Sequence, residues 1–338
     1  MREERIILSH GGGGRLMHQL IKKEIVPVLN NPSLAGLDDA ARIPLEPGSE
    51  AAMVMTTDSF VVKPLFFPGG DIGKLAVCGT VNDLATAGAV PCALAAGFII
   101  EEGFPISSLQ KILRSMKNTA DEVPVPVITG DTKVVERGRG EGIYISTTGV
   151  GSVPAGVGLS PKNIMPGDLV VINGPIGSHE ASVLCARGEF SLGVDITSDC
   201  APLSALMQKV LEVAPDARCA RDPTRGGVAS VLTELVELSG CGIVLEEEQI
   251  PVQDTVREVC EILGMDPLIM ANEGKMLVVV SREKAEACVE AMNSIPHGKG
   301  SRIIGKVTAG PARLSLNTAY GTTRVVTMPM GDQLPRIC

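Results

Sequence analysis

Residues 94–100, LAAGFII, form a short apolar run that stops at Glu101 and Glu102, which is typical of a strand in a buried sheet. A helical pattern follows over residues 106–123, and a second strand-like run follows over residues 125–129. Strands that alternate with helices in this way predict an α/β region. Spacing in the sequence leaves the order of the strands in the sheet open.

The same alternation extends in both directions along the chain. It predicts strands at residues 51–57, 143–148, 168–173, 276–281, 302–307 and 323–328, and helices at residues 72–87, 202–213, 228–238 and 283–292. Residues 149–167 are rich in Gly and Pro and are predicted to link two α/β regions. A helical pattern that includes Leu16 is expected to end at Pro27.

The composition argues against several classes of function. With 338 residues the chain is long enough for two domains with cores of their own. A formal net charge of −9 and only 2% aromatic residues argue against a nucleic-acid partner, which needs countercharge and stacking platforms. Nine cysteines, an odd number without a C-x-x-C pair, fit reduced thiols in the cytoplasm. Neither a signal peptide nor a membrane span is expected, because the first eight residues are charged and the apolar runs are short.

Four aspartates stand beside small residues at turns or on helix faces. They are Asp39, Asp58, Asp83 and Asp131. Three of them adjoin ends of predicted strands, where α/β proteins usually assemble ligand sites. Oxygen ligands from separate segments suit Mg²⁺, which is commonly held by a few carboxylates together with nucleotide phosphates and water. The set predicts a magnesium site, whereas each aspartate alone is typical of a cap or a turn.

Two acidic residues have further features. Asp83 lies in an apolar helical run, four residues after Gly79 and therefore on the same helix face, where a missing side chain lets a ligand approach. A buried carboxylate without a partner is costly, so we expect a cation or ligand there. The alternative is a solvent-facing Asp83. Glu273 could place a carboxylate at the edge of a cleft, although by itself it is more typical of a turn in water.

Glycine-rich segments precede three predicted helices. They are Gly11–Gly14, Gly69–Gly73 and the end of Arg221–Gly227. Backbone N–H groups at such helix starts favour phosphate oxygens, although neither of the first two segments matches the P-loop pattern. A flexible linker is the commoner explanation for four glycines near a terminus.

The chain ends in Pro335-Arg336-Ile337-Cys338, with a thiol at the last position. A thiolate is well suited to carry a one-carbon acyl group, and a terminus can present it to one partner and then fold it into another site. The segment from Gly331, a candidate hinge, to Cys338 spans at most ~26–29 Å, at about 3.3–3.6 Å per residue. The alternative is a frayed end that happens to finish in cysteine.

A set of motifs, in order along the whole chain, resembles the HypE family of hydrogenase maturation proteins, the carbamoyl dehydratases. The motifs are SHGGGG at 9–14, TTDS at 56–59, PLFFPGG at 64–70, GDTKVV at 130–135, ANEGK at 271–275 and PRIC at 335–338. Each motif alone is unspecific, whereas their combination is highly specific.

The resemblance implies a two-domain α/β (α+β) fold of the aminoimidazole-ribotide-synthetase-like, or PurM-like, superfamily. Residues 1–37 would be an N-terminal segment with a glycine-rich phosphate lid, residues 38–154 an ATP-binding and dimerisation domain, residues 155–330 a C-terminal α/β domain, and residues 331–338 a mobile catalytic tail. The sheet of the N-terminal domain would pair across a homodimer. ATP would lie in the cleft between the domains.

The resemblance also implies the activity and the partners. A HypF-type carbamoyltransferase would place a carbamoyl group on the terminal cysteine, and ATP-dependent dehydration would turn it into a thiocyanate. The cyanide would pass to iron carried by a HypC–HypD-type complex, for a nickel–iron hydrogenase. This is a cytoplasmic activity.

Residue roles follow from the same resemblance. Cys338 would hold the carbamoyl group, Glu273 would be the general base, Lys133 would stabilise the transferred phosphoryl group, and Asp83 would act beside them. Mg²⁺ would be held by Asp39, Asp58, Asp83 and Asp131. ATP would contact Gly11, Gly12, Gly13, Lys74, Gly79, Asn82, Asp131 and Thr132.

Two alternatives stay open. One is another ATP-using enzyme of the superfamily, such as a selenophosphate synthetase or an aminoimidazole ribotide synthetase. Selenophosphate synthetases carry a reactive Cys or selenocysteine in the N-terminal glycine-rich segment, which here contains none, and Cys338 has no role in either enzyme. The other is a nucleotide-binding scaffold that docks maturation partners without catalysis.

Overall fold

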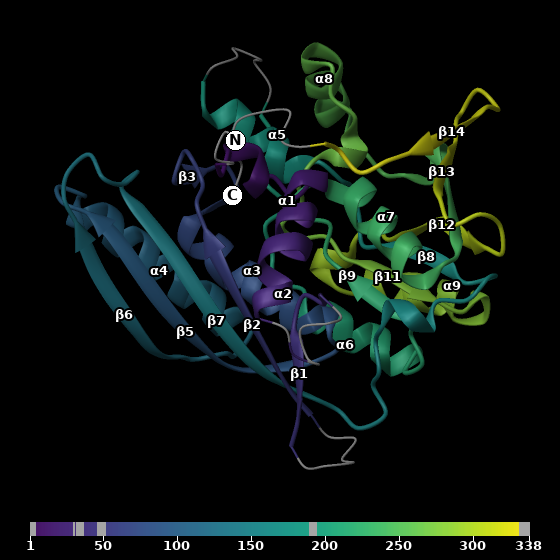
Figure 1. The fold of residues 1–338 in the computed structure, drawn as a ribbon, viewed down its shortest axis with the longest axis horizontal. Helices are drawn as coiled ribbons and strands as arrows, with labels where there is room; N and C mark the ends of the chain where they lie inside the picture. The colour runs from purple at the N-terminus through teal and green to yellow at the C-terminus, as the bar shows by residue number, and fades with distance from the viewer. Residues whose placement is uncertain (1–4, 30, 32–36, 46–51, 189–194, 331–338) are drawn as a thin grey trace.

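Two α/β domains make up the chain (Figure 1). The computed structural model describes residues 5–29, 31, 37–45, 52–188 and 195–330. Within these residues the first domain contains a five-stranded sheet and the second a seven-stranded sheet, and both combine parallel and antiparallel pairs. The predicted two-domain α/β fold is confirmed, and the predicted segment 331–338 with Cys338 lies outside the described residues.

The sheet of the first domain has its longest, best-paired strands in the middle and an exposed strand at one edge. Its order is β1 (Ala41–Pro44), β2 (Ala52–Phe60), β7 (Ile143–Val153), β5 (Val90–Glu101) and β6 (Val127–Val135). β5 and β6 are parallel and are joined by α4 (Ile106–Glu122), so the sequence stretch around residues 94–129 is a βαβ unit. β6 is exposed along nearly its whole length.

Helix α3 (Ile72–Thr86) connects the two domains. It packs against β2 and β7 of its own sheet and against α6 (Ser204–Val213) of the second domain, which is why it is buried on almost every side. One apolar cluster therefore crosses the boundary, with Val54 and Leu84 from the first domain and Leu206 from the second. This shared core keeps the two domains in a fixed relation.

The sheet of the second domain is covered by helices on both faces. Its order is β14 (Thr323–Val326), β13 (Leu314–Asn317), β10 (Gly242–Glu246), β12 (Arg302–Thr308), β8 (Leu169–Ile172), β11 (Leu277–Val280) and β9 (Cys219–Arg221). Val171 packs with α6 and α9 (Arg282–Asn293), whereas Val170 and Ile172 pack with α7 (Gly227–Ser239). Burial on both faces explains why β8 and β11 are continuous apolar runs rather than alternating ones.

The remaining elements are short. They are α5 (Ser178–Ala186), α8 (Asp254–Leu263), the hairpin β3 (Phe66–Phe67) and β4 (Gly70–Asp71), and the 3₁₀ turns Leu8–Gly11, Pro161–Asn163, Glu247–Gln249, Pro267–Ile269 and Pro296–Gly298. Among the described residues, no helix combines the length and the apolar character that crossing a bilayer requires. The eight cysteines of this part are all free thiols.

The first helix continues past the proline that was expected to end it. It runs through α1 (Arg15–Leu20), a π-helical turn (Ile21–Ile25) and α2 (Val26–Leu29), so Pro27 lies inside it. The wider turn directly before the proline changes the hydrogen-bond register at the point where the proline has no N–H to offer. Its α1 portion is docked on α7 by an ion pair between His18 and Glu234.

The predicted linker also begins too early. Residues 149–153, which were assigned to the linker at 149–167, are the end of β7. A side chain on Gly149 would come within 2.7 Å of Thr80 and 3.0 Å of Leu84 on α3. The glycine is there because the helix lies close above the strand, not because the chain turns.

Candidate active site between the two domains

A small acidic cavity lies between the domains. The first domain contributes Asp58, Ser59 and Phe60 of β2 and Gly79 and Asp83 of α3, and the second contributes Asp222, Thr224, Arg225 and Glu273. Its volume is about 40 Å³, and one water needs roughly 10–15 Å³. The cavity has room for an ion or a few atoms of a ligand, so most of a nucleotide would lie outside it.

Gly79 lines this cavity on the same side of α3 as Asp83, as the sequence predicted. A side chain at position 79 would come within 2.9 Å of the Phe60 ring and 3.4 Å of Asp58 Oδ2. The glycine therefore leaves the approach to both carboxylates open.

Like charges gather around Asp83. Burial, followed by the charges of Asp222, Asp39 and Asp58, raises the pKa of Asp83 well above its usual value. Burial and the Asp39 charge raise the pKa of Asp222 to about 8, and burial raises the pKa of Asp58. Carboxyl groups that repel one another in this way would be stabilised by a cation between them.

The carboxylates fit Mg²⁺ as partial rather than complete ligands. Among the residues that the structure describes, no three His, Cys, Asp or Glu side chains converge tightly enough to hold a metal ion by themselves. Mg²⁺ usually keeps several waters and shares one or two carboxylates with substrate phosphates. The donor set is therefore the kind that takes Mg²⁺ together with a nucleotide.

Asp39 lies near this cluster and pairs with an arginine of the other domain. Arg221 on β9 donates from Nη1 to Asp39 Oδ2 at 2.9 Å and from Nη2 to Asp38 Oδ1 at 2.7 Å. Burial nevertheless raises the pKa of Asp39, and the Arg221 charge opposes that rise. Arg221 thus holds the 38–39 turn against the second domain.

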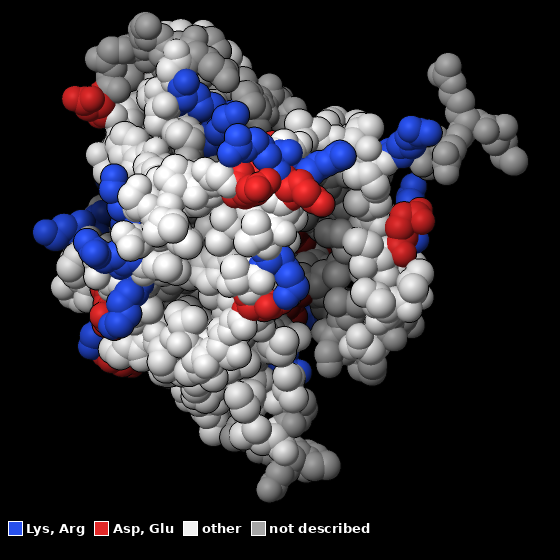
Figure 2. All heavy atoms as spheres, turned by 90° about the vertical axis from the view of Figure 1, so that its left-hand side faces the viewer, with Lys and Arg blue, Asp and Glu red and all other residues white. Residues whose placement is uncertain are grey.

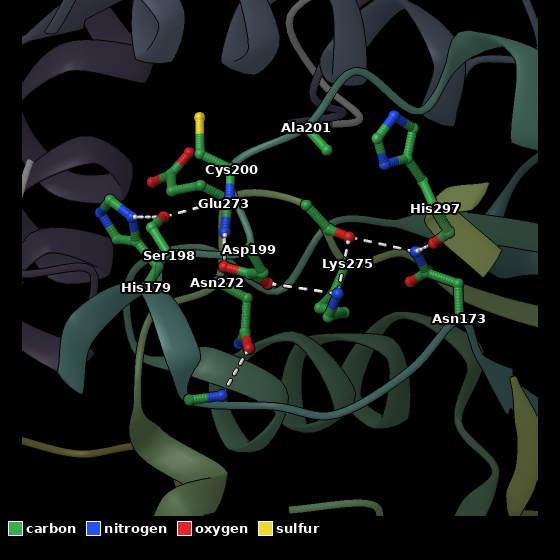
Figure 3. A network of polar contacts seen from close by, with 12 residues as sticks. Asn173, His179, Ser198, Asp199, Cys200, Ala201, Asn272, Glu273, Lys275 and His297 are labelled. Carbon is green, nitrogen blue, oxygen red and sulfur yellow. Dashed lines mark hydrogen bonds and ion pairs between the residues drawn. The ribbon is translucent and has the colours of Figure 1, made fainter. Parts of the chain in front are cut away.

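Glu273 is buried, not a solvated turn residue. Its exposed fraction is 4%, and Figure 3 shows its side chain next to Cys200. Burial, with smaller contributions from Cys200 and Asp222, raises the pKa of Glu273 well above its usual value. A carboxyl group with a raised pKa is a stronger proton acceptor once ionised, as a general base requires.

Asn82 of α3 joins the two domains through hydrogen bonds of its side-chain amide. Its Nδ2 donates to the carbonyls of Ala201 at 3.1 Å and Glu273 at 3.3 Å, and its Oδ1 accepts from the N–H of Leu203 at 2.8 Å. With its amide committed to these three bonds, the side chain positions the Glu273 segment. Its predicted contact with ATP is not what this geometry favours.

The N-terminal glycine run lies at the rim of the cavity. Arg225, which lines the cavity, donates from Nη1 to the carbonyl of Gly11 at 2.9 Å. Gly13 has φ +71°, and a Cβ there would lie 2.3 Å from Arg225 Cβ, so only glycine permits this approach. The predicted lid segment is therefore packed against the start of α7.

The base of the C-terminal tail lies at the same rim. The N–H of Arg15, directly after the glycine run, donates to the carbonyl of Pro329 at 3.0 Å. Pro329 is one residue from the end of the described chain. The end of the described chain thus lies beside the glycine run, which contacts Arg225 at the rim of the acidic cavity.

Three predicted site residues lie elsewhere in the chain. Asp131, Thr132 and Lys133 are on the exposed strand β6, and none of them lines the acidic cavity. Lys133 Nζ pairs with Asp131 Oδ2 at 2.5 Å, and that hydrogen bond is the main cause that lowers the pKa of Asp131. A single chain therefore does not bring Asp131 to the other three predicted aspartates, because β6 is at the far edge of the sheet.

Lys74 was predicted to contact ATP but lies outside the cavity, whereas Asp222 was not predicted and lies in it. Lys74 does not line the cavity, and its Nζ donates to the carbonyl of Gly69 at 2.9 Å. Asp222 was not singled out, although it lines the cavity and is buried. The available signal is its place in Arg221–Gly227, whose two glycines before a helix indicate an anion site but say nothing about the carboxylate.

Comparisons with known proteins agree on one family. Residues 37–153 match the N-terminal domain, and residues 165–316 the C-terminal domain, of AIR synthase related proteins. The chain is 49% identical over 339 residues to the carbamoyl dehydratase HypE of Azotobacter vinelandii, covering 100% of this chain and 98% of that protein.

Two solved structures are similar over most of the chain. A chain in a crystal structure of a HypE–HypF complex matches with a TM-score of 0.87 and 48% identity, covering 92% of this chain and 99% of that one. A crystal structure of the hydrogenase maturation protein HypE in complex with ATP matches with a TM-score of 0.81 and 40% identity, covering 99% and 100%.

Proposed function

The chain belongs to the AIR synthase related family and, within it, to the HypE carbamoyl dehydratases of hydrogenase maturation, and from this premise we propose that it dehydrates a carbamoyl group on its own Cys338. The group S–C(=O)NH₂ would become the thiocyanate S–C≡N. Its oxygen leaves as part of phosphate, both N–H hydrogens leave as protons, and ATP becomes ADP. The thiocyanate would supply cyanide for the iron of a nickel–iron hydrogenase.

One observation carries the proposal: the base of the tail adjoins the acidic cavity. Pro329 contacts Arg15, the glycine run before Arg15 contacts Arg225, and Arg225 lines the cavity with Glu273. Each link is a direct contact. The eight residues beyond Met330 can extend by up to ~26–29 Å, at about 3.3–3.6 Å per residue. This extension is several times the length of each contact between Pro329 and the cavity. A thiol at the end of this tail is therefore within reach of the carboxylates.

The residues around the cavity suit a magnesium nucleotide. Asp58 and Asp83, with Asp222 and Asp39 beside them, would hold Mg²⁺, while Arg225 and the N–H groups of the glycine run would meet phosphate oxygens. When bound, ATP and Mg²⁺ supply the phosphoryl group that makes the amide oxygen a leaving group, and the charge that offsets it. A relative with 40% identity binds ATP.

Glu273 is the candidate that takes a proton from the amide nitrogen. It is buried at the cavity, the hydrogen bond from Asn82 to its carbonyl holds its backbone, and its raised pKa favours proton uptake. Burial also keeps water away from the carboxylate, which protects an activated carbamoyl group from hydrolysis.

We further propose that the active form is a homodimer in which β6 pairs with a second copy. β6 is an open edge of the sheet and exposes 66% of Ile128 and 69% of Val134. Long exposed apolar edge strands are templates for pairing. Figure 2 shows that much of this side of the molecule carries no charged side chain. Such a dimer would give Asp131, Thr132 and Lys133 a route to the site of the partner.

The partners follow from the same activity. A HypF-type carbamoyltransferase would load Cys338, and one similar chain was solved in a HypE–HypF complex. An iron-carrying complex of the HypC–HypD type would then accept the cyanide, in the cytoplasm. We propose no nucleic acid and no membrane as a partner.

Mass measurement tests the proposal. The intact protein is incubated with carbamoyl phosphate, ATP and a HypF-type carbamoyltransferase, and the C-terminal peptide is followed over time. We expect a carbamoyl adduct on Cys338 that then loses one water in an ATP-dependent step. A carbamoyl adduct that forms and never loses water in the presence of ATP would contradict the proposal.

A further inference from the structure

The segment that carries Glu273 is fixed at both polar groups of its backbone. The N–H of Glu273 donates to Asp199 Oδ1 at 3.3 Å. Its carbonyl accepts from the N–H of Ala201 at 3.3 Å and from Asn82 at 3.3 Å. The Glu273 backbone is thus bonded to the 199–201 segment on both sides, which leaves its side chain as the part that faces the cavity.

Asp199 also forms a buried ion pair. Its Oδ2 lies 3.5 Å from Lys275 Nζ, and the two side chains are 6% and 11% exposed. Within the described part of the chain, Oδ2 has no hydrogen-bond donor, so Lys275 is the charge that offsets it. Lys275 Nζ also donates to the carbonyl of Gly274 at 3.2 Å. Asp199 therefore holds the residues before and after Gly274 at the same time.

The two segments are in backbone contact at Gly274. A Cβ there would lie 1.8 Å from the Asp199 carbonyl oxygen, so no larger residue permits this approach. The 198–200 segment is fixed from its other side, because Ser198 Oγ accepts from the N–H of Cys200 at 3.0 Å and lies 2.8 Å from His179 Nδ1. Figure 3 shows Asp199 and Lys275 facing each other beneath Glu273, which extends away from them.

A buried ion pair adds little to stability compared with apolar residues of the same size, so its presence calls for another reason. Its two charges here are arranged around the one carboxylate that the proposed reaction uses as a base. Resting on that proposed function, we propose that Asp199 is a positioning residue: it holds the peptide N–H of Glu273 and the ammonium of Lys275, so that the Glu273 carboxylate stays directed into the acidic cavity. Asp199 itself does not line the acidic cavity.

The chain offers a matched control. Asp168 and Arg218 form another buried ion pair in the second domain, at 3.4 Å with side chains 5% and 20% exposed. Asp168 Oδ2 also accepts a backbone N–H, that of Met165 at 2.8 Å. Neither residue lines the acidic cavity. Asp168→Asn therefore removes a comparable pair without touching the site.

The experiment compares full-length wild type, Asp199→Asn, Asp168→Asn and the double variant Asp199→Asn/Lys275→Met. Each is loaded by a HypF-type carbamoyltransferase with carbamoyl phosphate, and the single-turnover rate of water loss with saturating ATP, the Kd for ATP and Tm are measured. For Asp199→Asn we expect a rate lower by roughly 10–100-fold, as for a misplaced catalytic group, with the Kd for ATP unchanged. Asp168→Asn should lower Tm and leave the rate alone.

The double variant separates positioning from stability. Replacing Lys275 removes the unpaired buried charge, so Tm should recover relative to Asp199→Asn while the rate stays low. A rate that recovers together with Tm, an Asp199→Asn rate equal to that of Asp168→Asn, or a Kd for ATP that weakens as much as the rate falls would each overturn the inference. Failure of loaded wild type to lose water would instead overturn the proposed function, and the inference with it.

Discussion

The N–H of Arg15 donates to the carbonyl of Pro329 at 3.0 Å, which joins the start of the first helix to the base of the C-terminal tail. The two residues lie at opposite ends of the sequence, yet they meet at the rim of the acidic cavity. The glycine run and the tail therefore share one anchor, and a change in one is expected to affect the other.

Cys338→Ala should abolish thiocyanate formation and leave Tm and ATP affinity unchanged, because the thiol is proposed to carry the carbamoyl group and not to bind the nucleotide. Thiocyanate on the C-terminal peptide is followed by mass, and ATP binding by calorimetry. Cys92→Ala, which removes an exposed thiol elsewhere, is the control and should retain full activity. Loss of nucleotide affinity in Cys338→Ala would mean that the cysteine is structural.

Gly13→Ala should lower the rate of dehydration by more than its loss of folding stability explains. Its Cβ would collide with Arg225, and the left-handed backbone adds a cost of roughly 1 kcal/mol. Gly138→Ala is the matched control, since Gly138 has φ +79° and nothing within 4 Å of the added Cβ. We expect a similar strain cost there without loss of rate. Equal rates in the two variants would exclude a role for the glycine run as a lid.

Asp83→Asn should stabilise the metal-free protein and weaken magnesium nucleotide binding. It removes one of several buried carboxylates that repel one another, so Tm should rise by ~2 °C, while affinity for ATP with Mg²⁺ should fall about tenfold. Thermal shifts with and without Mg²⁺ and ATP measure both effects. Asp121→Asn, at an exposed pair with Lys117, should change neither. Unchanged ATP affinity in Asp83→Asn would remove this carboxylate from the nucleotide site.

Glu273→Gln and Lys133→Ala should each impair dehydration with ATP binding retained, and mixing the two should restore part of the activity. In a mixed dimer, one site combines an intact Glu273 with an intact Lys133 from the partner, if Lys133 acts across the interface. Variants are co-expressed with different tags, and the mixed species is purified and assayed. No recovery in a purified mixed dimer would place Lys133 outside the partner's site.

Docking of the first helix should weaken as the pH rises. The hydrogen bond between His18 Nε2 and Glu234 Oε1, at 2.6 Å, raises the pKa of His18 above 6.5. The contribution of protonated His18 is therefore complete below pH 6.5 and is lost as the pH rises through the raised pKa. Hydrogen exchange of residues 15–29 across this range measures it.

His18→Gln should remove this pH dependence, and His297→Gln, whose imidazole pairs with Glu122 far along the chain, should leave it intact. Helix protection that stays constant with pH in the wild-type chain would show that the ion pair does not control docking.

Much of the fold could be predicted from the sequence because strand and helix periods are local. The predicted helix at residues 72–87 is α3, and the predicted strands at 94–100 and 143–148 lie within β5 and β7. Two of the elements without predictions lack a clear period. α5 is buried on nearly every side, so it has no polar stripe, and β9 has only three residues.

The site could be predicted only in part, for the same reason. Asp58, Asp83 and Glu273 were expected from their motifs and do line one cavity. Asp199 carries no recognisable pattern, because its role depends on a contact with Lys275 that forms only when the two segments pack together.

The amino-acid sequence by itself determined which segments become helices and strands, which residues carry oxygen, nitrogen and sulfur chemistry, and the family to which the chain belongs. Only the tertiary structure decided the strand order, the separation of Asp131 from Asp83, and the meeting of Asp83 with Asp222. The physical reason is that periodicity acts over a few residues, whereas these contacts come from burying α3 between two domains.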